Sequence, residues 1–328
     1  MQKSSADPSG VTVIICCYNS AGRIAETLRH LAQQELQADL RFEVLLVNNA
    51  STDDTVATAQ KTWEELSPGI SLRIVNEQVP GQNHARRKGI EEAAFEIIIF
   101  CDDDNWLNKN YVQTAYQTMR SDEKIGAAGG QNIPATDALS YPDWFDEYSD
   151  KYALGIPALA SGDITQRGFV LGAGMVTRRS LFLEMYDDKY PTLLKGRDGE
   201  SLSTGDDFEY CKRLLLRGYS LFYAQPMTLQ HFIPKERLTL SYRERLMAGI
   251  YDAGKVINKY DDAIKIFRRN RHKNRLRIFL LTPLRILLSK LGLSGRRLED
   301  ERLALYYASP FEGNDPVKAA IKRFIYGS

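Results

Sequence analysis

Three consecutive aspartates, Asp102, Asp103 and Asp104, directly follow an apolar run over residues 97–101. Three like charges at the end of a buried strand need a neutralising partner. Carboxylates at D-x-D spacing on a tight turn are the oxygen ligands that Mn²⁺ or Mg²⁺ prefers, commonly together with substrate phosphates. A divalent metal site is therefore one interpretation, and a solvated acidic turn or a helix N-cap is the alternative.

The segments around this cluster alternate between strand and helix patterns. Strands are predicted over residues 11–18, 42–49, 72–77 and 96–101, and helices over residues 21–36, 51–66 and 85–94. Such alternation is typical of an α/β fold, a Rossmann-like and mostly parallel sheet flanked by helices. Further along the chain we expect a glycine-rich strand over residues 169–176, a helix after Gly205 and a strand over residues 220–224.

Polar side chains follow three of the predicted strands. Tyr18 and Asn19 follow the first strand, Asn48 and Asn49 end the second, and the aspartates follow the fourth. Ligands of open α/β sheets bind outside the carboxyl ends of the strands, so these side chains are expected to meet at one crevice.

Several nucleotide-binding classes are disfavoured by the motifs around this crevice. The first strand is followed by C-Y-N-S-A-G rather than the G-x-G-x-x-G of dinucleotide-binding enzymes, and no G-x-x-x-x-G-K-[ST] occurs. A phosphatase with an aspartyl nucleophile would usually carry its acidic motif after the first strand, not the fourth.

Six segments in order resemble family 2 glycosyltransferases with the GT-A fold. They are V-I-I-C-C-Y-N, L-L-V-N-N-A-S-T-D-D-T, G-Q-N-H-A-R-R-K-G-I, I-I-I-F-C-D-D-D-N-W-L, G-A-G-M-V-T-R-R and S-T-G-D-D-F-E-Y-C-K-R-L, within residues 11–231. The resemblance implies an inverting hexosyl- or N-acetylhexosaminyl-transferase. It would transfer a sugar from a nucleotide sugar, a UDP-sugar by default, to a hydroxyl of a glycan or lipid-linked glycan in bacterial-type surface polysaccharide synthesis.

The resemblance also implies roles for individual residues on the donor side. The expected donor-binding residues are Tyr18, Asn19, Asn48, Asn49, Arg86, Asp102 and Asp103, and the expected ligands of Mn²⁺ or Mg²⁺ are Asp102, Asp104 and His231. Asn48 stands where the family commonly has an aspartate that reads the base, and Arg87 replaces the asparagine of the usual A-R-N-x-G. An amide both donates and accepts, so Asn48 leaves the base open.

On the acceptor side, inversion requires a base that deprotonates the acceptor hydroxyl on the face opposite the leaving group. The resemblance assigns Asp207 as this base and Asp206 as the acid before it, whereas helix capping is the alternative for both. Trp144 and the backbone of Gly172, Ala173 and Gly174 are expected to contact the acceptor. Core packing of the aromatic ring and a strand bulge at the glycines are the alternatives.

The charge divides the chain into an expected catalytic domain over residues 1–240 and a basic, mainly helical region over residues 241–328. The second region holds 19 Lys/Arg against 9 Asp/Glu, which leaves 24 against 33 for the first. The basic run 268–277 precedes an apolar segment interrupted by Pro283, Arg285 and Lys290, too short to span a bilayer.

This tail predicts attachment to an anionic membrane surface, with insertion of apolar side chains. Those side chains are Phe279, Leu280, Leu284, Leu287 and Leu288. A packed helical subdomain or a homo-oligomer contact is the alternative, and no nucleic-acid partner is expected because the run lacks a recognisable binding module. Four cysteines without metal-ligand spacing and a start without signal-peptide features indicate a cytoplasmic protein, peripheral on the inner face of the membrane.

Two other functions stay open. A sugar-phosphate nucleotidyltransferase would share the architecture but carry a glycine-rich loop after the first strand. A non-catalytic nucleotide-sugar or glycan-binding protein would keep the fold without the acids of the metal site or the base.

Overall fold

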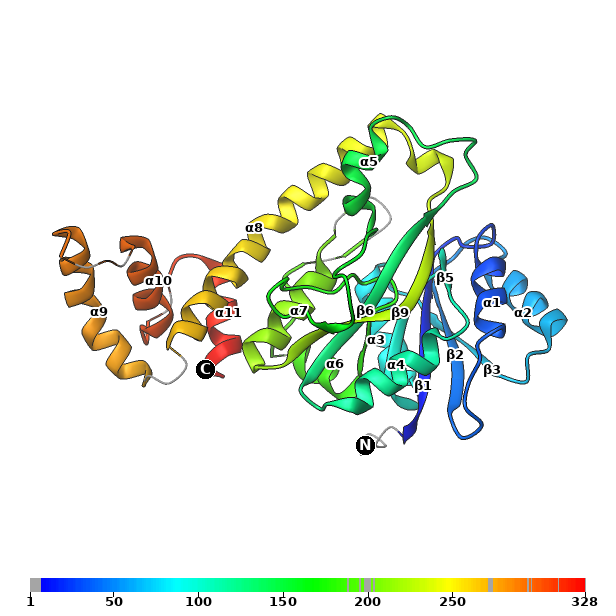
Figure 1. Cartoon of the computed structure of the whole chain (residues 1–328), viewed down its shortest axis with the longest axis horizontal. Coiled ribbons are helices and arrows are strands. Elements are labelled where there is room, and N and C mark those ends of the chain that lie inside the picture. The colour runs from blue at the N-terminus through cyan, green and yellow to red at the C-terminus, as the bar shows by residue number, and fades with distance from the viewer. Residues whose placement is uncertain are drawn as a thin grey trace.

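One mixed sheet organises the computed structural model, which describes residues 7–187, 189–194, 196, 197, 202, 204–270, 274–293, 295, 297–311 and 313–327. Within these residues the sheet has nine strands in the order β3-β2-β1-β4-β8-β6-β9-β5, with β7 paired to β9. Helices cover the sheet, and further helices extend from it toward the C-terminus (Figure 1). The predicted α/β fold with a C-terminal helical extension is therefore confirmed.

The bounds of the elements follow the expected alternation through β4. The strands are β1 (Asp7–Cys17), β2 (Arg41–Asn49), β3 (Ser71–Glu77), β4 (Phe95–Asp102), β5 (Asn105–Leu107), β6 (Ile125–Ala135), β7 (Gly162–Asp163), β8 (Val176–Arg178) and β9 (Ser220–Phe232). The helices of the sheet-bearing half are α1 (Ile24–Ala32), α2 (Thr55–Leu66), α3 (Gln82–Glu92), α4 (Tyr111–Ser121), α5 (Phe145–Tyr148), α6 (Arg179–Met185) and α7 (Asp206–Arg217). Short 3₁₀ helices are η1 (Ser149–Tyr152) and η2 (Lys235–Arg237).

The first four strands are parallel neighbours, and β1 lies between β2 and β4. The chain therefore winds outward from β1 in both directions, and a crevice opens where the strand order reverses, at the carboxyl ends of β1 and β4. Tyr18 follows one of these ends and the three aspartates occur at the other.

Both faces of β1 are buried, which explains why its sequence is apolar without alternation. Val13 and Ile15 pack in one core with side chains of α1, α2 and α4, whereas Ile14 packs on the other face with side chains of α3, α6 and α7. The four cysteines are free, and Cys17, Cys101 and Cys211 are buried.

Two predictions on the second half of the sheet are wrong. Residues 169–175 form no strand, and only Val176–Arg178 pair as β8, because Gly168 and Gly174 have φ values of +82° and +79°, which interrupt an extended backbone. The strand predicted to end at Ala224 continues to Phe232, since β9 resumes pairing with β6 after a register shift and also pairs with β5. His231 consequently lies within a strand rather than after it.

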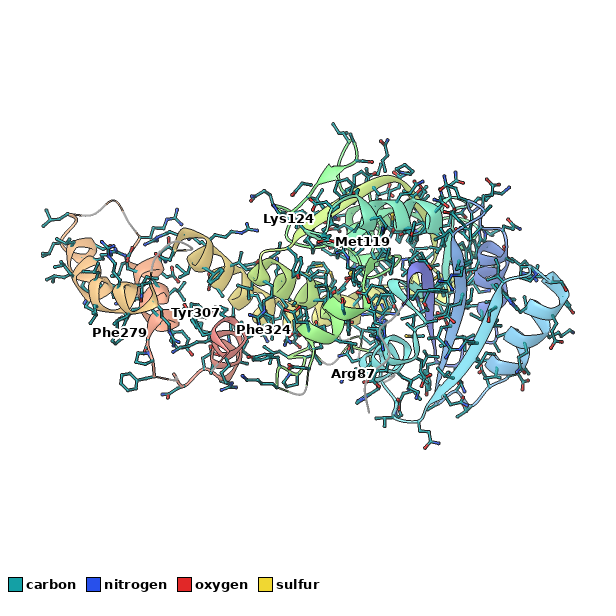
Figure 2. All side chains as sticks on the ribbon, turned by 90° about the horizontal axis from the view of Figure 1, so that it is seen from below. Arg87, Met119, Lys124, Phe279, Tyr307 and Phe324 are labelled. Carbon is teal, nitrogen blue, oxygen red and sulfur yellow. The ribbon has the colours of Figure 1, made fainter. Side chains whose placement is uncertain are left out.

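The C-terminal helices form an arm. The helix α8 (Leu240–Asn270) starts near α5 and leads to α9 (Arg275–Lys290) and α10 (Leu298–Ala308), which lie away from the sheet, whereas α11 (Pro316–Tyr326) returns beside α8 and α7 (Figure 1). Figure 2 shows Phe324 of α11 on the inner side of this arm and Phe279 of α9 toward its outer end. The Arg217 guanidinium lies 4.5 Å from the centre of the Phe324 ring and so ties α11 to α7. The division between residues 240 and 241 stays a prediction.

None of the helices within the described residues contains an apolar stretch long enough to cross a bilayer.

Candidate active site

A cavity of about 280 Å³ opens at the crevice between β1 and β4. The described residues that line it come from the ends of β1, β2, β4 and β9, from the loops after β1, β3 and β4, from α3, from the loop before β8, from the start of α7 and from η2. Among them are Tyr18, Arg23, Asn49, Arg86, Asp102, Asp103, Asp104, Gly172, Ala173, Arg197, Asp206, Asp207, His231 and Arg237. Most of the predicted site residues are therefore brought together in one place.

Asp103 holds the aspartate turn against α1. Its Oδ2 accepts a hydrogen bond from Arg23 Nη2 at 2.6 Å, and its backbone oxygen accepts one from the Thr27 hydroxyl at 2.8 Å. Burial and the charge of Asp104 raise the pKa of Asp103, while Arg23 opposes them. Arg23 thus supplies part of the neutralising charge that the three aspartates require.

Asp104 is paired with one side chain of β9 and one of η2. Its Oδ2 lies 2.9 Å from Arg237 Nη1, and its Oδ1 lies 3.5 Å from His231 Nε2. Burial alone would raise the pKa of Asp104, but His231 and Arg237 outweigh it and the pKa is lowered. Asp104 is therefore held as a carboxylate.

The orientation of His231 is set by the backbone of Tyr152. Nδ1 of His231 lies 2.9 Å from the Tyr152 carbonyl oxygen, and since a carbonyl only accepts, Nδ1 donates in this pair. In the neutral ring Nε2 is then left with its lone pair on the side of Asp104. This is the tautomer that a metal-binding histidine needs.

Asp102 differs from its two neighbours. It lines the cavity, and no side-chain hydrogen bond or ion pair to it occurs among the described residues. Burial raises the pKa of Asp102, with Arg86 opposing. A cation brought to the cavity would compensate this unpaired carboxylate.

The donor set of Asp102, Asp104 and His231 suits Mn²⁺ or Mg²⁺ in its chemistry, since it offers carboxylate oxygens and an imidazole nitrogen. In the part of the chain that the structure describes, however, no three His, Cys, Asp or Glu side chains are grouped closely enough to hold a metal ion. Arg237 occupies one oxygen of Asp104 instead.

Asp206 and Asp207 begin α7 after Gly205, whose φ is +96°. Asp206 forms an ion pair with Arg86 of α3, and the N-cap position of α7 is occupied by Gly205 rather than by either acid. Asp207 accepts hydrogen bonds on Oδ2 from the Gly172 N–H at 2.7 Å and on Oδ1 from the Phe208 N–H at 2.9 Å. Burial and the charge of Asp206 raise the pKa of Asp207 to about 6, with Arg86 opposing.

The loop of residues 172–174, called here the glycine loop, packs closely against Asp207 and Arg86. A Cβ on Gly172 would lie 3.1 Å from Asp207 Cβ and 3.3 Å from Arg86 Nη2, so a side chain here would press on both residues. Gly174 instead faces the core, where its carbonyl accepts from the Tyr111 hydroxyl at 2.8 Å. Gly172 and Ala173 line the cavity, and Gly174 is not among the described residues that do.

Besides Gly174, three more predicted site residues lie apart from the cavity lining, namely Asn19, Asn48 and Trp144. Asn19 accepts from the Thr52 N–H at 2.8 Å, and Asn48 donates to Asn76 Oδ1 at 2.9 Å, so both tie neighbouring strand ends together. Trp144 packs beside Tyr148, and the Arg243 guanidinium lies 5.0 Å from its ring centre.

Asn49 reaches the cavity but its amide is used by the backbone. It accepts from the Gly81 N–H at 2.8 Å and donates to the Val79 carbonyl at 2.7 Å, which shapes the loop before α3. Tyr18 differs, because half of its side chain is exposed at the mouth of the cavity.

Sequence reasoning missed Arg23, Arg197 and Arg237, cations of the cavity that no motif singles out. It also missed Glu209, a fully buried acid on α7 that pairs with Arg213 at 2.7 Å and accepts from the Tyr260 hydroxyl at 2.9 Å. The i, i+4 spacing of Glu209 and Arg213 was a visible signal for this pair.

Residues 12–182 match Glycosyl transferase family 2. This match covers more than half of the chain, so the chain belongs to that family. With the sheet and helices described above, this confirms the expected GT-A fold.

Individual relatives are similar over parts of the chain. The poly(ribitol-phosphate) beta-N-acetylglucosaminyltransferase TarS of Staphylococcus aureus (strain Mu50) is 33% identical over 104 residues, which are 32% of this chain and 18% of TarS. The glycosyltransferase AglE of Haloferax volcanii is 26% identical over 65% of this chain and 64% of its own length. The chain thus matches less than a fifth of TarS.

The fold is also similar to a solved structure. The crystal structure of S. aureus TarS 1-349 in complex with UDP superposes with a TM-score of 0.52 at 17% identity, and the match covers 92% of this chain and 81% of the TarS chain.

Proposed function

We propose that this protein is an inverting, divalent-metal-dependent glycosyltransferase that moves a sugar from a UDP-sugar to a hydroxyl of a glycan or lipid-linked glycan in surface polysaccharide synthesis. The observation that carries the proposal is that Asp102, Asp104 and Asp207 line one cavity at the carboxyl edge of a family 2 fold.

Asp207 is the base in this proposal. A pKa of about 6 leaves it mostly ionised at neutral pH yet basic enough to take a proton from an acceptor hydroxyl as the hydroxyl attacks the anomeric carbon. The Gly172 N–H holds one of its oxygens, and the ion pair of Asp206 with Arg86 keeps the neighbouring charge balanced.

The donor would lie along the opposite wall. Tyr18 offers an exposed ring on which a nucleotide base can stack, while Arg23, Arg197 and Arg237 supply positive charge for a diphosphate. A bound Mn²⁺ or Mg²⁺ would be held by Asp102, Asp104 and His231 and would stabilise charge on the departing diphosphate. TarS is named for N-acetylglucosamine transfer and crystallised with UDP, which supports a UDP-N-acetylhexosamine as the first donor to test.

One experiment separates this function from the two alternatives. The protein is incubated with nucleotide sugars and Mn²⁺, and the nucleotide products are identified. Release of nucleoside diphosphate that depends on an acceptor supports glycosyl transfer. Pyrophosphate from a nucleoside triphosphate and a sugar phosphate indicates a nucleotidyltransferase, and binding without turnover indicates a non-catalytic protein.

We also propose that α9 attaches the enzyme to the inner face of a membrane, where lipid-linked acceptors lie. Ile278 and Thr282 of α9 are buried within the arm, and Phe279 also packs there rather than facing outward. The opposite side of the helix carries leucines spaced by three or four residues, each between 52% and 64% exposed. They are Leu276, Leu280, Leu284, Leu287 and Leu291, called here the leucine face.

Charge favours a bilayer over a second copy of the chain as the partner of the leucine face. The helix α9 contains Arg275, Arg277, Arg285 and Lys290 but no acidic residue, so two copies packed face to face would bring cations together. Anionic lipids complement this charge, and each nearby cation contributes about 1 kcal/mol. Arg271 and Lys273 of the basic run lie outside the described residues.

A further inference from the structure

We infer that Arg237 is an exchangeable cation of the donor site: its guanidinium holds Asp104 while metal and donor are absent, and moves to the donor diphosphate when a divalent metal takes Asp104. This inference rests on the proposed function and assigns Arg237 a donor-binding role that no motif indicates. The starting observation is the 2.9 Å pair between Arg237 Nη1 and Asp104 Oδ2 inside the cavity.

The two cations compete for the same carboxylate. Asp104 Oδ1 already accepts from Asn105 Nδ2 at 3.1 Å and faces His231, while Oδ2 holds Arg237. Within a cavity of reduced dielectric, a guanidinium and a divalent ion on the same carboxylate would repel each other strongly. Metal binding at Asp104 would therefore weaken the hold of Asp104 on the guanidinium and favour its departure.

The backbone around Arg237 is held in place, so only its side chain needs to move. Its N–H donates to the Pro234 carbonyl at 2.8 Å, and its carbonyl accepts from the Tyr152 hydroxyl at 3.1 Å. The neighbouring segment is anchored as well, since the Phe232 N–H donates to the Asp104 carbonyl at 2.8 Å.

The side chain also has somewhere to go. The Arg237 side chain is 21% exposed, against 5% for Asp104, and both residues line the cavity. A guanidinium binds two phosphate oxygens at once through its planar fork, so a diphosphate in the cavity would compensate the loss of Asp104. Arg237 would then couple the arrival of the metal to the binding of the donor.

The test measures binding rather than turnover, with Mn²⁺ and UDP as probes. Mn²⁺ alone is titrated by electron paramagnetic resonance, and UDP is titrated by calorimetry at saturating Mn²⁺, for the wild type, Arg237→Ala and Arg237→Lys. We expect Arg237→Ala to bind Mn²⁺ at least about fivefold more tightly and UDP at least about fivefold more weakly, the usual lower range for coupling between two sites. Arg237→Lys should keep the competing charge but lose the bidentate phosphate contact, so only its UDP affinity should fall.

Lys235→Ala is the matched control, because it removes an exposed cation from the same short helix η2. Both affinities should be unchanged in this variant. Equal Mn²⁺ affinity in wild type and Arg237→Ala, or weaker Mn²⁺ binding in the variant, would overturn the inference and leave Arg237 a structural partner of Asp104. If Arg237→Ala does not fold, Arg237→Lys decides the question through its UDP affinity. A wild type that binds neither probe would instead overturn the proposed function itself.

Discussion

The N–H of Gly172 and the carboxylate of Asp207 are joined by a 2.7 Å hydrogen bond across 35 positions of the chain. The bond joins a loop before β8 to the first turn of α7 and points one oxygen of Asp207 toward the glycine loop. A side chain at position 172 would press on Asp207 and Arg86. The orientation of the proposed base therefore depends on a glycine.

The Asp207→Asn variant should keep the fold and lose most of its sugar-transfer activity. An amide preserves the shape but cannot take a proton at neutral pH, so kcat should fall by about 10²- to 10⁴-fold, the usual contribution of a general base. UDP release with a saturating acceptor measures the loss, and UDP affinity serves as the control because the proposed role of Asp207 is toward the acceptor. A variant as active as the wild type would remove Asp207 from this role.

The activity should depend on pH through the same carboxylate. Because burial and Asp206 raise the pKa of Asp207 to about 6, the base is ionised above that pH and protonated below it. On the acidic side kcat/KM should therefore fall by about tenfold per pH unit.

Circular dichroism at each pH would show whether the fold persists across this range. The residual activity of Asp207→Asn should not show this fall of kcat/KM at acidic pH. A wild-type profile that stays flat down to pH 4 would contradict the assignment, since a carboxyl of ordinary pKa titrates at about that value.

Glu209→Gln should destabilise the protein although Glu209 is not among the described residues that line the active-site cavity. The Glu209 and Arg213 side chains are 0% and 2% exposed, and neutralising Glu209 leaves the Arg213 charge buried without its partner. Breaking a buried pair in this way typically costs about 3–5 kcal/mol. Chemical denaturation measures this, and Glu65→Gln, in the exposed pair with Lys61, is the control and should change stability by less than about 0.5 kcal/mol. Equal effects of the two changes would show that the buried network is not a stabilising anchor of α7.

Attachment to vesicles should require the leucine face. At low salt the full-length protein should sediment with anionic vesicles, and Leu280→Ser with Leu284→Ser should abolish this because both leucines would insert. Salt should weaken attachment by screening the cations, whereas detergent should be needed for full release.

The control exchanges Leu139 and Leu159 for serine, two exposed leucines of the sheet-bearing half. Those changes should leave sedimentation as in the wild type. A full-length protein that remains in the supernatant with anionic vesicles at low salt would favour the packed or oligomerising tail instead.

The sequence by itself determined the strands and helices through β4 and the placement of the aspartates at a strand end. These follow from local patterns: apolar runs of strand length, helical spacing, and polar residues where a strand stops. The six motifs in order also determined the family. The strand predicted over residues 169–176 was wrong, because the positive φ values of Gly168 and Gly174 interrupt an extended backbone.

Only the tertiary structure decided which charges meet. Arg237 reaches Asp104 across 133 positions and Arg86 reaches Asp206 across 120, and no local pattern encodes such pairs. The tertiary structure also decided which side of α9 is buried. The sequence of this helix has apolar residues on both of its sides, so the pattern alone does not distinguish them. Packing within the arm buries Ile278 and leaves Leu280 open, and that choice depends on helices folded back from later in the chain.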